Sequence, residues 1–205
     1  MKQALFALAA TVALAAAPAA FADTSETGIV DLIGNVPDQC SVISSTTSGG
    51  AVPGGASFGD TVNLGTIAGA NGELGGSISG STADQLPTET FQINCTGANN
   101  QVTLVATPLA TTGATPPAGY ANSVNYTAEA DFAVVGGGAN PAVLSQSSTI
   151  ATPASANLGA GVRLANSGSN NVTIKAYGFN TTNPTAILVA GTYNGQITVT
   201  ISAGV

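Results

Sequence analysis

Apolar and polar side chains alternate with a period of two residues along much of this 205-residue chain. The clearest alternation lies at residues 193–202, where Ile197, Val199 and Ile201 share one face and hydroxyl or amide side chains occupy the other. A period of two is typical of a β-strand that has one face buried. The pattern therefore predicts a half-buried strand at residues 193–202.

Other segments with the same period predict a chain composed almost wholly of strands. No window keeps the helical period of 3.6 residues beyond two turns, because Gly, Pro, Asn and Thr interrupt each candidate. Stretches rich in Gly, Ser or Pro predict loops at residues 45–57, 107–119 and 136–140. The other predicted strands cover residues 41–44, 60–67, 89–95, 101–106, 122–128, 132–135, 161–165 and 172–177.

This succession of short strands predicts the fold class. Many strands separated by turns favour an antiparallel β-sandwich, with a β-barrel as the lesser alternative. The positive mean hydropathy of +0.33 and the low charged fraction of 6% indicate a folded chain rather than a disordered one. The length suits a single domain.

The amino terminus predicts export. Lys2 precedes an apolar run at residues 4–17, and the small-residue motif Ala-Phe-Ala follows at 20–22. This order is typical of a secretory signal peptide, here residues 1–22, and the mature chain would begin at Asp23. The apolar run is too short to span a bilayer, so we expect no membrane insertion.

Charge and cysteine content narrow the function classes. Arg163 and Lys175 are the mature chain's cations against ten carboxylates, so the chain has no basic patch for nucleic acid. Cys40 and Cys95 would reach an oxidising compartment, where an even pair is more often a disulfide than a metal or redox site. We expect no cofactor and no metal, because the chain contains no His and no closely spaced cysteine pair.

An enzyme is disfavoured by the residues available. Without His the commonest general base and the usual triads are missing. Glu129 and Asp131, two residues apart, would share a strand face and resemble a glycosidase or calcium pair, but there is no Trp to bind sugar rings. We favour a solvated strand edge for this pair and predict no catalytic residue. Asn-x-Thr patterns at Asn125, Asn171 and Asn180 carry little weight in so Thr-rich a chain.

Another alternating segment lies just after the predicted cleavage site. Residues 27–40 read TGIVDLIGNVPDQC and place Val30, Leu32 and Val36 on one face. The segment is therefore a predicted strand that ends at a cysteine. Its pairing partner is not evident from its own sequence.

Four short motifs follow one another along the predicted mature chain: CSV at 40–42, FGDTVNLGTIAG at 58–69, FQINC at 91–95 and AGTYNGQITVTI at 190–201. Their order resembles that in the subunits of bacterial chaperone-usher pili, closest to the archaic pilins and spore-coat-U-like domains. Gly191, Thr192 and Tyr193 match the Gly-x-Tyr turn that introduces the last strand in that family.

The resemblance implies an immunoglobulin-like sandwich, residues 38–205, that lacks its final strand. A neighbouring copy would fill the open groove by donor-strand complementation. It further implies a disulfide between Cys40 and Cys95. The implied donor is the extension at residues 23–37, with Val30, Leu32, Gly34 and Val36 pointing inward. The implied groove residues are Ile197, Val199 and Ile201.

Two alternatives stay open for the extension. Residues 28–36 could form the first strand of their own domain. A register shifted by one residue would point Ile29, Asp31 and Ile33 inward instead, and burial of the Asp31 carboxylate disfavours it.

The resemblance implies a structural subunit of a non-covalent surface fibre that supports adhesion or biofilm formation. Its partners would be copies of itself or related pilins, a periplasmic chaperone and an outer-membrane usher. The protein would pass through the periplasm to the cell surface. The alternative is a self-contained secreted β-sandwich that binds carbohydrate or a surface.

Overall fold

The structure is a computed structural model that divides the chain into two units, residues 1–35 and 36–205. None of the described residues lies in a helix, so no helix among them could cross a membrane. Of the first unit only residues 32–35 are described. The predicted signal peptide, Ile29, Val30 and Asp31 therefore lie outside the described residues. The described residues are 32–44, 55–57, 62–75, 78, 89–113, 115–137, 139–166 and 168–204.

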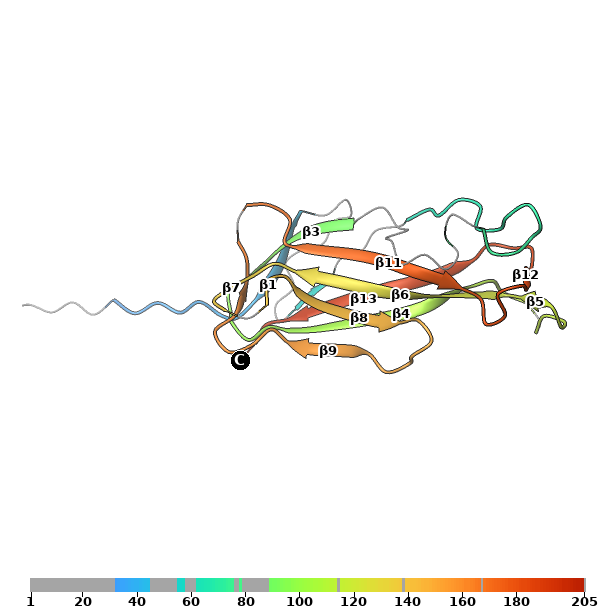
Figure 1. The fold of residues 1–205 in the computed structure, drawn as a ribbon. Coiled ribbons are helices and arrows are strands. Elements are labelled where there is room, and N and C mark those ends of the chain that lie inside the picture. Colours follow the sequence, from blue (N-terminus) through green and yellow to red (C-terminus); the bar gives the residue numbers. More distant parts are fainter. Residues whose placement is uncertain are drawn as a thin grey trace, which may run out of the picture. The chain divides into compact units, whose positions relative to one another are not determined.

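The second unit is an all-β antiparallel sandwich, which confirms the predicted fold class (Figure 1). One layer contains β1 (Cys40–Ser44), β3 (Glu89–Cys95), β11 (Val172–Asn180), β6 (Ser123–Phe132) and β8 (Ala142–Ser147), in that order across the sheet. The other layer contains β9 (Ala154–Asn157), β4 (Gln101–Ala110), β13 (Asn194–Ser202) and β2 (Gly55–Ser57).

The two layers are joined through β6. Its first residues pair with the end of β4, at Ser123 opposite Ala110, and the rest of the strand pairs with β11 and β8. Two small ladders complete the fold at opposite ends of the sandwich (Figure 1). They are the antiparallel pair β7 (Val134–Val135) and β10 (Arg163–Leu164), and the parallel pair β5 (Tyr120–Ala121) and β12 (Ile187–Leu188).

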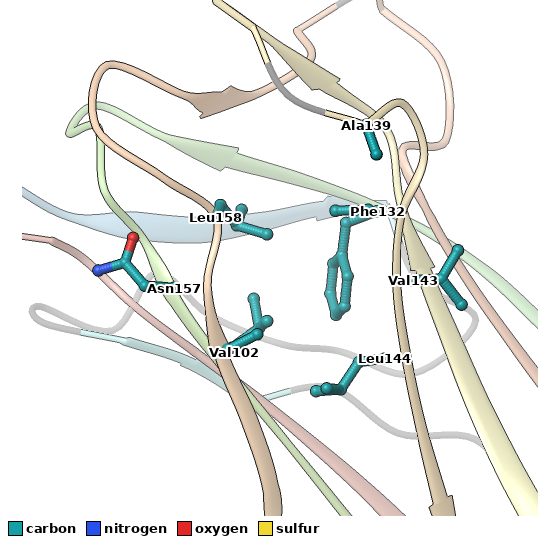
Figure 2. A pocket seen from close by; sticks show the side chains of 9 residues that line it. Val102, Phe132, Ala139, Val143, Leu144, Asn157 and Leu158 are labelled. Atoms are coloured by element: carbon teal, nitrogen blue, oxygen red, sulfur yellow. The ribbon is translucent and has the colours of Figure 1, made fainter.

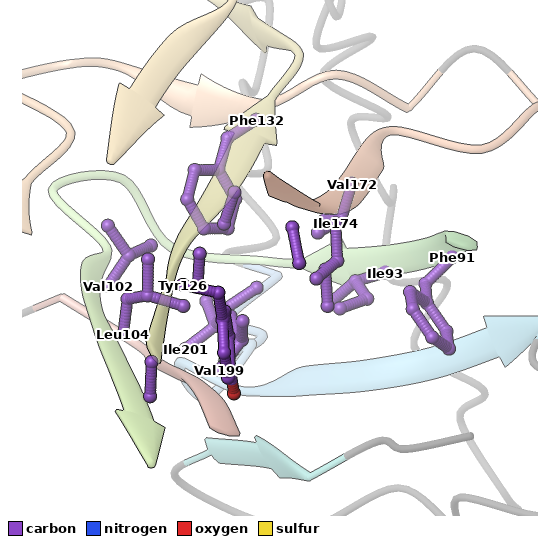
Figure 3. Packing of buried hydrophobic residues seen from close by; sticks show 14 of the residues in the cluster. Phe91, Ile93, Val102, Leu104, Tyr126, Phe132, Val172, Ile174, Val199 and Ile201 are labelled. Carbon is purple, nitrogen blue, oxygen red and sulfur yellow. The ribbon is translucent and has the colours of Figure 1, made fainter. Parts of the chain in front are cut away.

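The core lies between the layers, and strict alternation fills it. Every second residue of β6 is buried, from Val124 to Phe132. Figure 3 shows side chains from both layers meeting there, with Val102 and Leu104 of β4 on one side and Ile93 of β3 on the other. Burial of each large aliphatic or aromatic side chain contributes about 1.5 to 3 kcal/mol. Burial of these alternating apolar side chains is therefore the main source of the fold's stability.

The strand predicted at residues 60–67 is wrong over the part that the structure describes. Residues 62–67 belong to no strand, and Gly65 has a φ of +67° that ends an extended conformation. The Asn63 side chain accepts a hydrogen bond from the Gly65 amide at 2.8 Å. This local turn competes with sheet pairing, as Asn side chains commonly do.

Other boundaries differ because tertiary pairing extends or creates strands. β4 continues to Ala110, four residues into the loop predicted at residues 107–119, and β11 continues to Asn180. β6 runs unbroken through Phe132, where two strands had been predicted. Short strands that the alternation did not predict are β2, β5, β8, β9 and β12.

Candidate functional site

The outer edge of β13 is the first feature of the candidate site. β13 pairs with β4 from Asn194 to Ser202, whereas β2 pairs with its other side only at Thr200, Ile201 and Ser202. Among the described residues no strand pairs with this outer side along residues 194–199. An unpaired edge presents backbone donors and acceptors that can receive another strand.

The predicted groove residues lie on the inner face of β13. Val199 and Ile201 are fully buried in the core, as Figure 3 shows, and Ile197 is partly buried. Ile201 sits where β2 covers the edge, opposite Ala56, while Ile197 and Val199 lie along the uncovered part. The uncovered edge therefore lies directly beside apolar core side chains.

The start of β13 is held by a tyrosine from the opposite layer. The Tyr126 hydroxyl donates a hydrogen bond to the Gln196 carbonyl oxygen at 3.0 Å, and its ring stacks on Phe179. Burial raises the pKa of Tyr126 to about 12. The Gln196 amide also donates to the Thr107 hydroxyl at 2.9 Å, next to an irregularity in the β13–β4 register. This end of the open edge is thus tied to both layers.

The Gly-x-Tyr segment before β13 forms a packed turn. The Tyr193 hydroxyl donates to the carbonyl oxygens of Ala121 and Val189, at 3.0 and 2.9 Å. A Cβ atom at Gly191 would collide with the Thr111 hydroxyl, so a larger residue there would displace the turn. The motif that supported the resemblance therefore has a packing role in this chain.

The predicted donor residues show exposed apolar side chains. Leu32 is 93% exposed and Val36 is 73% exposed. No atom lies within 4 Å of the position that a Cβ would take at Gly34. Residues 32–39 belong to no strand, and Val30 lies outside the described residues. Large aliphatic side chains with this much exposed surface can be covered by another protein chain.

The beginning of the folded unit is anchored to the turn after β3. The Gln39 amide donates to the Thr96 hydroxyl at 3.0 Å, and the Thr96 amide donates to the Gln39 carbonyl at 2.9 Å. The Thr96 hydroxyl in turn donates to the Pro37 carbonyl at 2.8 Å. Next to this anchor, a disulfide joins Cys40 to Cys95, which confirms the predicted bond.

The side of β4 that faces away from β13 has partners at both of its ends. β9 pairs with β4 from Gln101 to Leu104, and β6 pairs with it at Leu109 and Ala110. Between them, the buried Gln146 side chain accepts a hydrogen bond from the Ala106 amide at 2.8 Å. Its amide group donates to the carbonyls of Ile150 and Thr152. One side chain therefore replaces the missing strand.

A second buried amide closes a gap in the other layer. The Asn171 carbonyl oxygen accepts from the Ile93 amide at 2.9 Å, and its NH₂ group donates to the carbonyls of Ile93 and Ala165 at 2.7 Å. This side chain continues the β3–β11 pairing beyond Phe91. Because its amide is buried and engaged, Asn171 is no glycosylation acceptor in the folded protein. Only its pairing context, not its sequence pattern, reveals this role.

A small apolar pocket of about 90 Å³ lies between β8 and β9 (Figure 2). Val102, Phe132 and Leu144 form its floor and wall, while Val143 is exposed at its side. Polar groups that recognise a sugar are scarce in this lining, since only Asn157 contributes an amide side chain. The pocket is a gap between two edge strands with an aliphatic surface.

Glu129 and Asp131 share one face of β6, as predicted, but they do not lie on a strand edge. β6 runs between β11 and β8, and Lys175 of β11 reaches both carboxylates, at 3.6 Å from Glu129 and 2.9 Å from Asp131. The Tyr177 hydroxyl donates to Glu129 at 3.2 Å. The pair is therefore an ion-pair cluster on the outer sheet face. Among the described residues no group of three His, Cys, Asp or Glu could hold a metal.

Comparisons with protein-family models, with curated proteins and with solved structures find no match to this chain. Its function must therefore be argued from its own residues, and the open β13 edge is the feature that carries the argument.

Proposed function

We propose that this protein is a structural subunit of a non-covalent surface fibre. Residues 23–37 of one copy would add a strand to the open β13 edge of the next copy. The observation that carries the proposal is that residues 194–199 of β13 have no strand partner on their outer side among the described residues. Exposed Leu32 and Val36 supply the apolar side chains that such an edge requires.

Burial of apolar side chains favours strand addition. Transfer of Val30, Leu32 and Val36 from water into a groove would contribute roughly 4.5 to 9 kcal/mol, at about 1.5 to 3 kcal/mol for each of the three side chains. New ladder hydrogen bonds would satisfy the outer backbone groups of β13. Each copy carries both an edge and an extension, so the contact repeats without closing and yields a fibre.

The uncovered edge also sets the length of the contact. Six residues, 194–199, have no strand partner on this side within the described part of the chain, whereas β2 covers the last three residues of β13. A donor strand that places Leu32 beside Ile197 or Val199 would match this length, because its four inward positions are Val30, Leu32, Gly34 and Val36. Gly34, which has open space around its Cβ position, would allow close approach of the two backbones.

The resemblance to chaperone-usher pilins supplies the assembly route of this proposal. A periplasmic chaperone would cover the open edge until an outer-membrane usher exchanges it for the next subunit's extension. The protein would then act at the cell surface, where fibres support adhesion or biofilm formation. The proposal includes no catalytic step and no cofactor.

A test compares the mature chain with its Leu32→Asp and Ile33→Asp variants. We expect Leu32→Asp to abolish polymers, because the new carboxylate would be buried in the neighbour's core. Ile33→Asp changes the adjacent exposed residue on the opposite strand face and is the matched control, so we expect normal polymers. Unheated samples in mild detergent, separated by size, measure the polymer.

The same pair of variants decides between the alternatives. Polymers in both variants would refute the donor role of the extension. Loss of polymers in Ile33→Asp alone would indicate a register shifted by one residue. Failure of Leu32→Asp to fold, judged by its circular dichroism, would indicate that residues 28–36 form a strand of their own domain.

A further inference from the structure

Arg163 and Glu73 lie at opposite ends of the sandwich, each within a small exposed patch. Exposed Asp38 also lies at the end that holds Arg163, where its carboxylate lies against Gly97, so the two patches are defined by their own side chains and not by the net charge of each end. At one end, Arg163 of β10 pairs in register with Val135 of β7, which is 52% exposed. At the other end, Glu73 forms a β-bridge with Ile187, and Ile187 pairs with Tyr120. We call Val135 and Arg163 the basic end patch, and Glu73, Ile187 and Tyr120 the acidic end patch.

Each patch combines one charge with exposed apolar surface. Directly paired residues in a ladder place their side chains on the same face, so each charge lies beside its apolar partners. Ile187 is 38% exposed and Tyr120 is 46% exposed. Neither Arg163 nor Glu73 forms an ion pair with another described residue, although both are exposed. The other cation of the mature chain, Lys175, is already neutralised on the outer sheet face.

The basic end patch lies at the end from which the extension starts. The Asn99 amide donates to the Val162 carbonyl at 3.1 Å, which fastens β10 to the same turn that holds Gln39 through Thr96. The end of β13 is at this turn as well, where the Gly204 amide lies 3.4 Å from the Asn100 side-chain oxygen. The acidic end patch lies at the opposite end, beside β5 and β12 (Figure 1). β4, with ten residues, spans about 34 Å between the two ends.

Strand direction decides which ends meet in a fibre. A donor parallel to β13 would bring its own domain to the end where the acceptor's extension also starts, so both neighbours of each copy would crowd at one end. An antiparallel donor brings its domain to the opposite end and leaves room for the next copy. The strands already paired with β13, β4 and β2, are both antiparallel to it.

We propose that the basic end patch of each copy docks on the acidic end patch of the next, with Arg163 paired to Glu73 across the junction and Val135 against Ile187 and Tyr120. This inference rests on the proposed fibre and specifies a second contact in it, distinct from the donor strand. The occupant of each patch is a second copy of this chain, chosen by the complementary charge and the exposed apolar residues on both sides.

The test is a charge-reversal cycle in the mature chain, with Arg163→Glu, Glu73→Arg and the double variant. The measured quantity is the rate at which purified polymers release monomers in mild detergent. We expect each single variant to release monomers about 5-fold faster, because two like charges face each other at the junction. The double variant restores an opposite-charge pair, and we expect its rate to return to within about 2-fold of the parent's.

Two further measurements sharpen the test. Exposed Ser155 on β9 pairs with uncharged Thr103 and provides the control. Ser155→Glu and Ser155→Arg add one negative and one positive charge outside the two end patches, and we expect parental rates from both. We also expect high salt, about 0.5 M against about 0.05 M, to speed release from the parent and to leave the difference between parent and single variants smaller.

Failure of the junction is distinguishable from failure of the fibre proposal. If Leu32→Asp abolishes polymers but the single charge reversals release monomers at the parental rate, the junction is wrong and the donor strand stands. If the double variant is no slower than the single variants, Arg163 and Glu73 do not meet. If polymers survive Leu32→Asp, the fibre proposal itself is overturned.

Discussion

β4 and β13 lie side by side in one layer, but their outer edges are treated differently by the chain. The edge of β4 is covered by β9 at one end and by β6 at the other, and the Gln146 side chain binds the Ala106 amide between them. Among the described residues, the outer edge of β13 is covered only at Thr200–Ser202. The same sheet thus contains a gap of four residues, 105–108, that a buried amide enters, and a stretch of six residues, 194–199, with no described strand partner on its outer side.

Unpaired backbone groups are not common to all strand edges of this fold. Buried polar side chains close gaps at two places, through Gln146 and Asn171, and each satisfies backbone groups that would otherwise be buried without partners. By contrast, no described side chain or strand covers the outer edge of β13 at residues 194–199, where apolar core side chains lie beside it. This combination favours a role in binding another strand.

The largest expected effect comes from the disulfide, which joins β1 to β3 in the layer opposite β13. Replacement of Cys40 and Cys95 by Ala, in the monomeric Leu32→Asp background, should lower the free energy of unfolding by about 4 kcal/mol, because the bond closes a loop of 55 residues. Denaturant unfolding of oxidised and Cys-free proteins measures it. A loss below about 1 kcal/mol would show that β1 and β3 are held together by sheet pairing alone.

Gln146→Ala opens the closed edge and so breaks the comparison directly. We expect a loss of about 3 kcal/mol in the free energy of unfolding, since the Ala106 amide and two carbonyls would lose their partners. The matched control is Gln101→Ala, which truncates an exposed glutamine on β4, the strand that contains Ala106. We expect its loss to be under about 0.5 kcal/mol. Equal losses in the two variants would contradict the role assigned to Gln146.

Hydrogen exchange compares the two edges without changing either. In the Leu32→Asp monomer, the amides of residues 194–199 that point away from β4 should exchange about 100-fold faster than the Ala106 amide. In parental polymers the same amides should become protected, because a donor strand would cover them. Slow exchange at both edges of the monomer would mean that the β13 edge is not open in solution.

The smallest expected effect is a loss of stability at alkaline pH. It depends on buried Tyr126, whose hydroxyl donates to the Gln196 carbonyl oxygen at the start of β13. The pKa of Tyr126 is about 12 in the folded protein against 10.0 for an ordinary tyrosine. Below about pH 10 both states keep the proton, and the contribution is intact. Between pH 10 and 12 the unfolded chain loses its proton first, so stability should fall by roughly 2 kcal/mol.

Tyr126→Phe is the control for the alkaline loss. It removes the titrating hydroxyl and its hydrogen bond to Gln196, so its stability should be lower at neutral pH and flatter above pH 10. Burial raises the pKa of Tyr193 also, and that residue remains in both proteins. An unchanged alkaline slope in Tyr126→Phe would assign the loss to Tyr193.

Alternation predicted the long strands because their burial is local to each strand. In β6, β11 and β13 apolar residues recur at every second position, and the disulfide was predicted from a cysteine pair in a chain with an expected signal peptide. The short strands β8 and β9 were not predicted because neither has an apolar alternation: Val143 and Leu144 are adjacent in β8, and β9 contains only Ala, Ser and Asn. Pairing with β6 and β4 makes them strands. The segment at residues 62–67 misled because a local Asn63 turn outweighed its apolar pattern.

The residue pattern was enough to predict an all-β chain with a half-buried last strand, an alternating apolar segment near the amino terminus and a disulfide-forming cysteine pair. These properties depend on the period and chemistry of neighbouring residues. The tertiary structure was needed to show which edges are covered, that Leu32 and Val36 are exposed, that Gln146 and Asn171 bind backbone groups in place of strands, that Lys175 pairs with Glu129 and Asp131, and that Arg163 and Glu73 lie at opposite ends. Each of these depends on residues far apart in the chain being brought into register, which no local pattern records.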